Sequence, residues 1–466
     1  MPIHRCKAIV TVPRICLVIL LALGFGACGV PRNSELQSHA ARRIQVMASD
    51  GWIYDVMGEL VKSFEKESGI KVSFTIYAPH IYDRALRTML ASGEATDVFL
   101  AQSTRWTLGT EFDPSKCCID LMNQEWTKRL KPEWLPAVSY KGKIYGLVIW
   151  DDRVGWVYTY NSKIFQRLGL SPPRNAEEFL AICARLKQSG IVPIYEPGAS
   201  RWHSALTFFE MGAAFEKSDP GIYDRLNSNR QTFAGYKPFY GALEQIILAV
   251  RHGYFGNDFM ANTIEGAKDA LLSGAAAMTL NKIGFARSVL KVDPNSGAQS
   301  WGMFPIPWLD NQTVSIERSA PVWFGNEKSH DKEAIIDLFN FLTRQDSLDR
   351  YALEQPEGTS LSFPTKAVPL LPNERSFLES AHLGGEPIQG GVKYIMGQWM
   401  EIEADFEQML TGAMTSHQFL SNIDRRRNNM AAAVSDPAWL HVASSQAAGA
   451  IDGTLSRVAD RNTAAE

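Results

Sequence analysis

Four residues in the first third of the chain combine an aromatic ring with strong hydrogen-bonding groups. Trp150, Asp151 and Asp152 are consecutive, and Gln102 directly follows the short apolar run 97–101. An indole face packs on flat apolar surfaces, an ionised carboxylate accepts strong hydrogen bonds, and an amide both donates and accepts. These types suit a guest with an apolar ring face and a rim of hydroxyls. The alternative interpretation is a surface loop or hinge at Trp150 and a solvated loop at Gln102.

Adjacent carboxylates also raise the question of catalysis. Retaining glycoside hydrolysis uses two carboxyl groups about 5–5.5 Å apart across one bond. Neighbours on a strand point to opposite faces, so Asp151 and Asp152 do not form such a pair. The sequence contains no nucleophile elbow, HExxH motif or phosphate-binding loop, and no Cys/His spacing resembles a zinc site. We therefore expect no enzyme, no cofactor and no metal; a secreted carbohydrate-active enzyme is the less favoured alternative.

The first 27 residues indicate export. A basic start is followed by the apolar run 15–27, which is too short to span a bilayer stably, and then by Cys28. This layout resembles the signal of bacterial lipoproteins, in which the cysteine is acylated and becomes the first residue. Phe25 departs from the usual leucine of such signals. We expect a signal peptide over 1–27, lipidation at Cys28 and a tether over 28–43; plain secretion and an uncleaved anchor are the alternatives.

Length, charge and cysteine content limit the remaining possibilities. The chain of 466 residues is longer than one hydrophobic core usually serves, so we expect two lobes or domains. Its formal net charge of -3 gives no reason to expect nucleic acid as a partner. Cys117 and Cys118 are adjacent, which fits disulfide geometry poorly, and Cys183 lies on the apolar stripe of a predicted helix. We predict no disulfide framework.

The elements that must position these side chains alternate between strand and helix. Apolar residues at helical spacing and alternating runs predict this order for the first part of the chain: strand 44–48, helix 56–64, strand 70–76, helix 82–92 and strand 97–101. This rhythm is typical of an α/β protein with a parallel-rich sheet covered on both faces.

The same rhythm returns further along. Asn175 with Glu178 three residues later predicts a capped helix start. Other predicted elements are strand 191–195, helix 267–273, strands 275–280 and 301–307, helix 332–343 and a helical stretch over 393–430. The Ala/Ser-rich end, 437–466, shows little periodicity, and we expect a poorly ordered tail.

Six segments match a known family in the family's order. The chain resembles the family 1 extracellular solute-binding proteins of bacterial ABC importers, a group that includes maltodextrin-binding proteins. Each segment is weakly specific alone, and the set in order is strong. The matching segments are LVKSFEKESGIKV at 60–72, MLASGEATDVFL at 89–100, YKGKIYGL at 140–147, YTYNSKIFQRLGL at 158–170, GAAAMTLN at 274–281 and GMFPIP at 302–307.

The resemblance implies an α/β, two-lobe periplasmic-binding-protein-like fold of type II, with ligand held in a cleft between lobes joined by hinge segments. Lobe closure on bound ligand follows from contacts made only in the closed state. The lobes are expected over 44–155 plus 306–346 and over 156–305 plus 347–436. The expected crossings lie near 153–156, 304–308 and 346–352.

The resemblance also implies ligand contacts at the ends of strands. Ser49, Asp50 and Trp52 follow the first strand, where the family places such contacts, with a turn and a packing Trp as the alternative. Trp202 and His203 lie in the loop where the family commonly has a stacking aromatic, although a lone His is more often structural.

Two further candidates come from the second half of the chain. Asn281 ends a buried strand at the family's Asn-Gly-Ser-Trp position, but here the sequence reads Asn281-Lys-Ile-Gly-Phe, which puts stacking there in doubt. Trp323 is the last candidate. We assign the remaining Trp residues mainly to packing.

The function implied is the substrate-binding component of an ABC importer, capturing a small solute, foremost a mono- or oligosaccharide, for delivery to the transmembrane permease subunits. We expect a monomer that is extracytoplasmic and attached to the membrane by its lipid anchor. The alternative keeps the fold and changes the ligand to a polyamine, a phosphate ester or a cationic solute; the acidic Asp50, Asp151 and Asp152 suit the cationic ligands.

Overall fold

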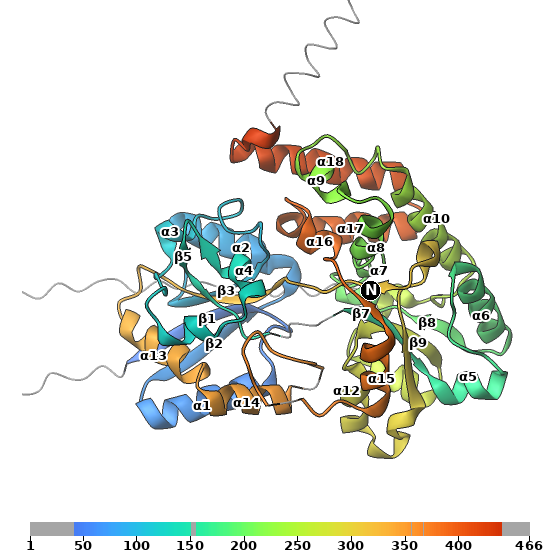
Figure 1. Ribbon diagram of the computed structural model, residues 1–466, viewed down its shortest axis with the longest axis horizontal. Coiled ribbons are helices and arrows are strands. Elements are labelled where there is room, and N and C mark those ends of the chain that lie inside the picture. The colour runs from blue at the N-terminus through green and yellow to red at the C-terminus, as the bar shows by residue number, and fades with distance from the viewer. Residues whose placement is uncertain (1–41, 151–154, 356, 367, 440–466) are drawn as a thin grey trace, which may run out of the picture. The chain divides into compact units, whose positions relative to one another are not determined.

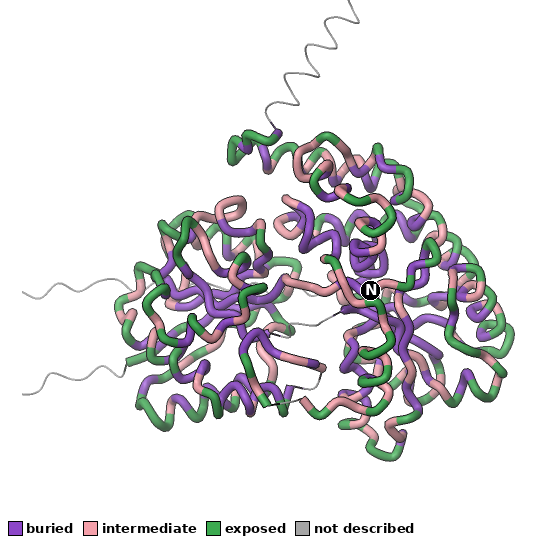
Figure 2. Tube along the Cα trace, in the orientation of Figure 1, coloured by how far each residue is buried: buried purple, intermediate pink, exposed green. Residues whose placement is uncertain are grey.

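The computed structural model describes residues 42–150, 155–355, 357–366 and 368–439. Its buried apolar side chains form two main cores, each around one sheet, which defines two lobes. The core of lobe 1 draws on residues 44–150 and 320–363, and that of lobe 2 on 156–308 and 388–423. The inner strands are buried, the edge strand β2 is not, and the outer sides of many helices are exposed (Figure 2).

The sheet of lobe 1 has five strands in the order β2-β1-β3-β12-β6. The first three strands are parallel, and β12 is antiparallel to both β3 and β6. The antiparallel β12 was not predicted. The strands are β1 (Arg43–Ser49), β2 (Lys71–Tyr77), β3 (Val98–Ser103), β6 (Gly146–Leu147) and β12 (Ala320–Gly325).

Helices from distant parts of the sequence cover this sheet. Val56, Leu60 and Phe64 form the buried stripe of α1, which ends at Gly69 in the left-handed conformation, φ 74°. The late helices α13 and α14 pack beside α1, where they appear in orange among blue elements (Figure 1). The helices are α1 (Asp55–Ser68), α2 (Pro79–Ser92), α3 (Pro114–Cys117), α4 (Leu135–Val138), α13 (Lys332–Leu342) and α14 (Gln345–Glu354).

The sheet of lobe 2 has four strands in the order β10-β7-β9-β8. Strand β7 is antiparallel to both of its neighbours, and only β8 and β9 are parallel. Two short ribbons, β4 with β5 and β11 with β13, complete the described strands. The bounds are β7 (Trp156–Asn161), β8 (Val192–Tyr195), β9 (Ala276–Lys282), β10 (Trp301–Phe304), β4 (Ser139–Tyr140), β5 (Lys143–Ile144), β11 (Thr313–Val314) and β13 (His382–Leu383).

Most described helices of lobe 2 lie between β8 and β9 or in the C-terminal part of the chain. The predicted cap of α6 is confirmed, because the Asn175 side chain accepts a hydrogen bond from the Glu178 N–H. The helices are α5 (Ser162–Leu168), α6 (Ala176–Gln188), α7 (Leu206–Phe209), α8 (Gly212–Ser218), α9 (Ile222–Asn227), α10 (Lys237–Arg251), α11 (Gly266–Ser273), α12 (Phe285–Val292), α15 (Pro372–Ser380), α16 (Ile388–Gly391), α17 (Trp399–Leu410) and α18 (Ser416–Ala433).

The C-terminal part differs from the prediction at two points. The expected helical stretch is divided between α17 and α18 at Gly412, which has φ 81°. Trp439 falls in the predicted tail, yet it is buried, packs edge-on against Tyr394 and donates its indole N–H to the Asn227 carbonyl at 2.9 Å. The remainder of that tail, 440–466, lies outside the described residues, as do the expected signal peptide and Cys28.

The packing corrects the predicted lobe boundaries. Ile306 and Trp308 belong to the core of lobe 2, not lobe 1, while Leu348, Tyr351 and Phe363 belong to the core of lobe 1, not lobe 2. The second and third crossings therefore lie later than expected, at about 315–319 and 364–371. A Cβ atom on Gly155 would lie 2.8 Å from the Ser315 carbonyl, so the first two crossings touch there. Among the described helices, none combines the length and apolar character needed to cross a membrane.

Candidate functional site

A cavity of about 1030 Å³ is lined by residues of both lobes. From lobe 1 come the segments that follow β1 and β3, and from lobe 2 those that follow β8 and β9. Ligands of α/β sheets bind beyond the carboxyl ends of the strands, because loops there present free polar groups. Seven predicted residues line this cavity: Ser49, Asp50, Trp52, Gln102, Trp150, Trp202 and Asn281.

The turn after β1 places one indole and one carboxylate at the cavity. Asp50 is exposed, and its backbone N–H donates to the Tyr77 carbonyl at 2.8 Å, which ties the turn to the end of β2. Trp52 is half-buried and meets Tyr82 edge-to-face, with ring centroids 5.1 Å apart. The Tyr82 hydroxyl donates to backbone carbonyls of β1 and β3, so the support of Trp52 is rigid.

Trp150 is held from two sides. Tyr54 stacks on its ring at 5.6 Å, and Lys282 of lobe 2 places its Nζ 4.6 Å from the ring centroid and 3.4 Å from the Tyr54 hydroxyl. Burial lowers the pKa of Lys282, but the Tyr54 phenol and the carboxylates of Glu357 and Glu317 outweigh it, so the net shift is upward. The ammonium is therefore charged at neutral pH. Lobe 2 thus contacts the Trp150 platform directly.

The predicted neighbours of Trp150 are not all described. Asp151 and Asp152 lie outside the described residues. Asn281 is buried, and its Oδ1 accepts the backbone N–H of Lys282 at 2.8 Å. Asn281 also lines the cavity.

Polar side chains connect β3 to the crossing before β12. Gln102 donates its amide to the Ser319 hydroxyl at 3.1 Å, and Ser319 in turn donates to the Glu317 carboxylate. Burial raises the pKa of Glu317; the Ser319 hydroxyl, Lys282 and other donors offset this only in part. All four of these residues line the cavity.

Three indoles form the lobe 2 wall. Trp156 lies opposite Lys282 in the pairing of β7 with β9 and meets Trp202 at 6.0 Å with a 65° angle between rings. Trp399 donates its indole N–H to the Trp202 carbonyl at 3.1 Å. Trp156 and Trp399 are buried, while Trp202 is half-buried and more accessible. This wall can stack on a flat apolar ring face.

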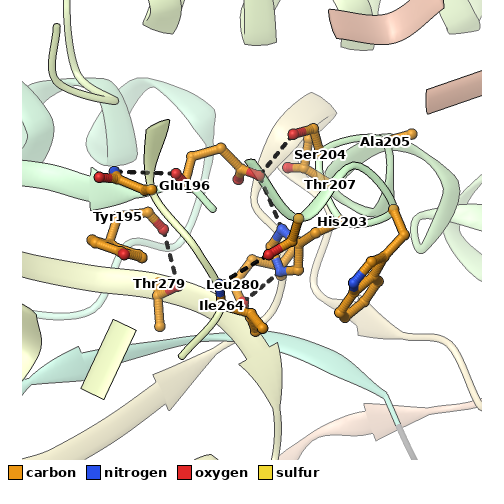
Figure 3. A network of polar contacts seen from close by, with 12 residues as sticks. Tyr195, Glu196, His203, Ser204, Ala205, Thr207, Ile264, Thr279 and Leu280 are labelled. Atoms are coloured by element: carbon orange, nitrogen blue, oxygen red, sulfur yellow. Dashed lines mark hydrogen bonds and ion pairs between the residues drawn. The ribbon is translucent and has the colours of Figure 1, made fainter. Parts of the chain in front are cut away.

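His203 does not line the cavity, which corrects its assignment as a ligand contact. Its Nδ1 lies 2.9 Å from the Glu196 carboxylate and its Nε2 3.0 Å from the Leu280 carbonyl, and the Ser204 hydroxyl donates to the same carboxylate (Figure 3). The imidazole is fully buried and packs edge-on against Trp156 and Trp202. Both ring nitrogens are occupied by protein acceptors, so His203 supports the indole wall from behind.

Trp323 is also absent from the cavity lining. It lies in β12 between β3 and β6, is 3% exposed and meets the Phe74 ring edge-to-face at 6.4 Å. All six residues of β12 are buried; Trp323 in the middle of the strand packs in the core of lobe 1, whereas Pro321 near its start reaches the cavity. Trp323 is a packing residue, which corrects the prediction.

The carboxyl groups of Glu111 and Asp83 also line the cavity, at α2. Glu111 has its pKa raised to about 8, chiefly by burial and then by Asp83, while Arg87 and the Gly397 N–H oppose the shift. Burial likewise raises the pKa of Asp83. Arg87 of lobe 1 donates to the Gly397 carbonyl of lobe 2 at 3.0 Å. This cluster therefore joins the two lobes beside the cavity.

The prediction missed several residues that line the cavity. Trp156 was assigned to packing, and Lys282 was noted only as a departure from the family pattern. Their signal was available, since Trp156 begins a strand and Lys282 ends one. Glu317 and Gln389 gave none, because they lie on a crossing and in a short late helix; Trp399 was assigned to packing, although it begins α17. The lining residues missed include Trp156, Lys282, Glu317, Ser319, Gln389 and Trp399.

Two α/β lobes that share a ligand-sized, aromatic-walled cavity define a two-lobe binding protein. A model of the family described as bacterial extracellular solute-binding protein matches residues 49–347, which is well over half of the chain. The chain belongs to this family, as the resemblance predicted. The family's extracellular character supports an extracytoplasmic location.

Individual relatives agree with this assignment. The melibiose/raffinose/stachyose-binding protein MelE of Bacillus subtilis is 23% identical over 321 residues, covering 66% of this chain and 70% of the relative. A sugar transporter of Bacillus licheniformis in complex with stachyose has a TM-score of 0.66 at 15% identity, covering 83% of this chain and 100% of that one. The solute-binding protein RafE in complex with raffinose has a TM-score of 0.62 at 16% identity, covering 83% and 99%. These structures confirm the two-lobe fold.

Proposed function

We propose that the protein captures a short oligosaccharide between its lobes and delivers it to the permease subunits of an ABC importer. The observation that carries this proposal is the cavity itself, whose lining combines indoles of both lobes with amides and carboxylates. Its volume of about 1030 Å³ is at the upper end of the roughly 300–1,000 Å³ typical of small-molecule sites, which favours several sugar rings over one.

The proposed contacts divide by chemistry. Trp52 and Trp202 are the accessible indoles that stack on sugar rings, one from each lobe. Asp50, Gln102 and Asn281 hydrogen-bond hydroxyl groups, and ligand that touches both sets favours the closed state. Ser49 and Trp150 complete the predicted set that lines the cavity, and Asp151 and Asp152 stay part of the proposal from sequence alone.

The remaining features of the proposal concern location and partners. We propose acylation at Cys28, which holds the lobes at the membrane surface near the permease, and a monomeric protein. No catalytic role is proposed.

Isothermal titration of the purified protein with melibiose, raffinose, stachyose and maltotriose tests the proposal. At least one saccharide should bind with micromolar or tighter affinity, which corresponds to about 8 kcal/mol. The polyamine spermidine serves as the control ligand. Binding of spermidine without any saccharide, or turnover of a bound saccharide, contradicts the proposal.

A further inference from the structure

Buried polar atoms without partners occur beside the cavity. Within the described part of the chain, the Trp156 indole nitrogen, the Gln389 amide oxygen and one carboxylate oxygen of Glu210 make no hydrogen bond. The three residues are exposed by only 6%, 2% and 2%, respectively. Buried polar atoms are nearly always paired with protein, water or ligand. Trp156 and Gln389 line the cavity, where a ligand can reach them.

These atoms gather around Glu317. Gln389 and Trp156 both lie close enough to lower the pKa of Glu317 against the upward effect of burial. Trp156 lowers the pKa of Glu317 as a hydrogen-bond donor would, yet no acceptor among the described residues lies within hydrogen-bond distance of the indole nitrogen, so a ligand group can complete that bond. Gln389 donates its Nε2 to Glu210 at 2.5 Å, which determines the amide orientation and leaves the amide oxygen unpaired.

The set offers one donor and two acceptors. The donor is the Trp156 N–H, and the acceptors are the Gln389 amide oxygen and the Glu317 carboxylate. A hydroxyl group accepts from the indole N–H and donates its single hydrogen to one of the two acceptors, so two neighbouring hydroxyls of a sugar ring satisfy the whole set. An ammonium group only donates and would leave the indole N–H unpaired.

We propose that Trp156, Gln389 and Glu317 form a subsite that binds hydroxyl groups of the ligand and disfavours an amine there, with Glu210 as the positioning residue for Gln389. This inference rests on the proposed function and specifies how one end of the ligand is recognised. It differs from the predicted contacts, which did not include these residues.

The charges around the subsite favour an uncharged ligand. Burial raises the pKa of Glu210 and of Glu317, and the Glu317 carboxylate raises the pKa of Glu210 further. Lys282 already lies near both carboxylates and opposes the shift. A second ammonium from the ligand would find little uncompensated negative charge.

The subsite also joins the first and second of the three crossings. Trp156 follows the first crossing directly, and Glu317 lies within the second. A hydroxyl bound to both side chains would therefore link the two segments about which the lobes move.

Titration of raffinose and stachyose into matched variants tests the subsite. Glu317→Gln should weaken binding on the order of 10- to 100-fold, because a charge-assisted hydrogen bond is lost, and Trp156→Phe on the order of 5- to 10-fold. Trp126→Phe is the matched control, since its indole N–H is equally buried and unpaired but lies in the core of lobe 1. Glu379→Gln is the exposed carboxyl control. Both controls should stay within twofold of the wild type.

A double variant shows whether the two side chains hold the same hydroxyl. Combining Glu317→Gln with Trp156→Phe should cost less than the product of the single effects, because the second change removes a bond already weakened. Unchanged affinity in either single variant, with a normal thermal unfolding midpoint, overturns the subsite. A single variant that does not fold is replaced by Gln389→Met, for which the same outcomes apply.

A ligand-free crystal structure at high resolution separates this inference from the proposed function. If the wild type binds no saccharide, the proposed function fails, and the subsite is judged from that structure alone. A water hydrogen-bonded to both the Trp156 N–H and the Gln389 amide oxygen supports the subsite. A direct hydrogen bond from Trp156 to Gln389 or Glu317 overturns it.

Discussion

Two tryptophans that look equivalent in the sequence have different surroundings. Replacing half-buried Trp202 with Ala should weaken saccharide binding by about 3- to 10-fold, since a stacked pair contributes about 0.5–1.5 kcal/mol beyond burial. Replacing core Trp323 with Ala should instead lower the free energy of unfolding by about 3–5 kcal/mol. Titration calorimetry and urea denaturation of both variants measure the two effects. A Trp323 variant that unfolds like the wild type but fails to bind would reverse the assignment.

Glu111 gives the stability a specific pH dependence. Its pKa is raised from an ordinary 4.5 to about 8, chiefly by burial and then by Asp83. The folded protein therefore holds this proton more tightly than the unfolded chain does, so the contribution is complete below about pH 4.5 and is lost as the pH rises through about 8.

Thermal unfolding midpoints between pH 5 and pH 8.5 measure this effect. The midpoint should fall with pH less steeply in Glu111→Gln than in the wild type, because the variant cannot lose the proton. Glu133→Gln, at an exposed position, is the control and should keep the wild-type slope. Equal slopes in all three proteins would show that Glu111 does not titrate in this range.

At the residue scale, local alternation locates the ends of strands. Ser49, Gln102 and Asn281 lie at or next to the last residue of a strand and Trp52 just after one; all four line the cavity, and their contact with ligand stays a prediction. Trp323 does not line the cavity, because both faces of β12 are buried and alternation does not show how far along a strand the cavity lies. Residues on crossings have no local signal, since their neighbours come from remote parts of the chain.

The cap of α6 allows a stability prediction for a single element. Asn175→Ala should lower the free energy of unfolding by about 1 kcal/mol, because the Glu178 N–H loses its acceptor. Gln188→Ala, exposed at the other end of the same helix, should change it by less than about 0.5 kcal/mol. Urea denaturation measures both. Neither position lines the cavity, so a loss of saccharide affinity in Asn175→Ala would contradict this separation of roles.

At the element scale, alternating strands and several amphipathic helices were predictable, whereas the long helix α10 and the short buried helices were missed. Leu206, Thr207, Phe208 and Phe209 of α7 are all buried, so no polar face marks the helical period. A helix of four residues also has little stability of its own and depends on tertiary packing. The helices α8 and α9, with seven and six residues, were missed because they are too short to show a clear helical period.

The contact between the first two crossings makes a prediction for the whole molecule. Gly155→Ala would place a Cβ against the Val314 side chain and 2.8 Å from the Ser315 carbonyl, so it should destabilise the protein by about 1–3 kcal/mol. Gly58→Ala is the matched control, because its Cβ meets nothing within 4 Å in the middle of α1, and it should be neutral or stabilising. Urea denaturation measures both variants. A Gly155 variant as stable as the wild type would show that the crossings can separate there.

At the scale of the whole molecule, length and the family resemblance predicted two lobes, and the boundaries were wrong. Ile306 and Trp308 stay with lobe 2 because both belong to its core and the turn at Trp308 packs on α6 and α10, and α14 stays with lobe 1 because it packs on α1. Which lobe a segment joins depends on such remote contacts, so local patterns locate elements better than they assign them.

The positions of the Trp residues also allow ligand binding to be followed by intrinsic fluorescence. Trp52, Trp150, Trp156, Trp202 and Trp399 surround the cavity, whereas rings such as Trp134 and Trp308 are fully buried elsewhere. The emission wavelength of the Trp residues around the cavity should shift as water leaves it. The emission of the fully buried Trp residues should stay constant. Ligand binding can therefore be followed in real time without an attached dye.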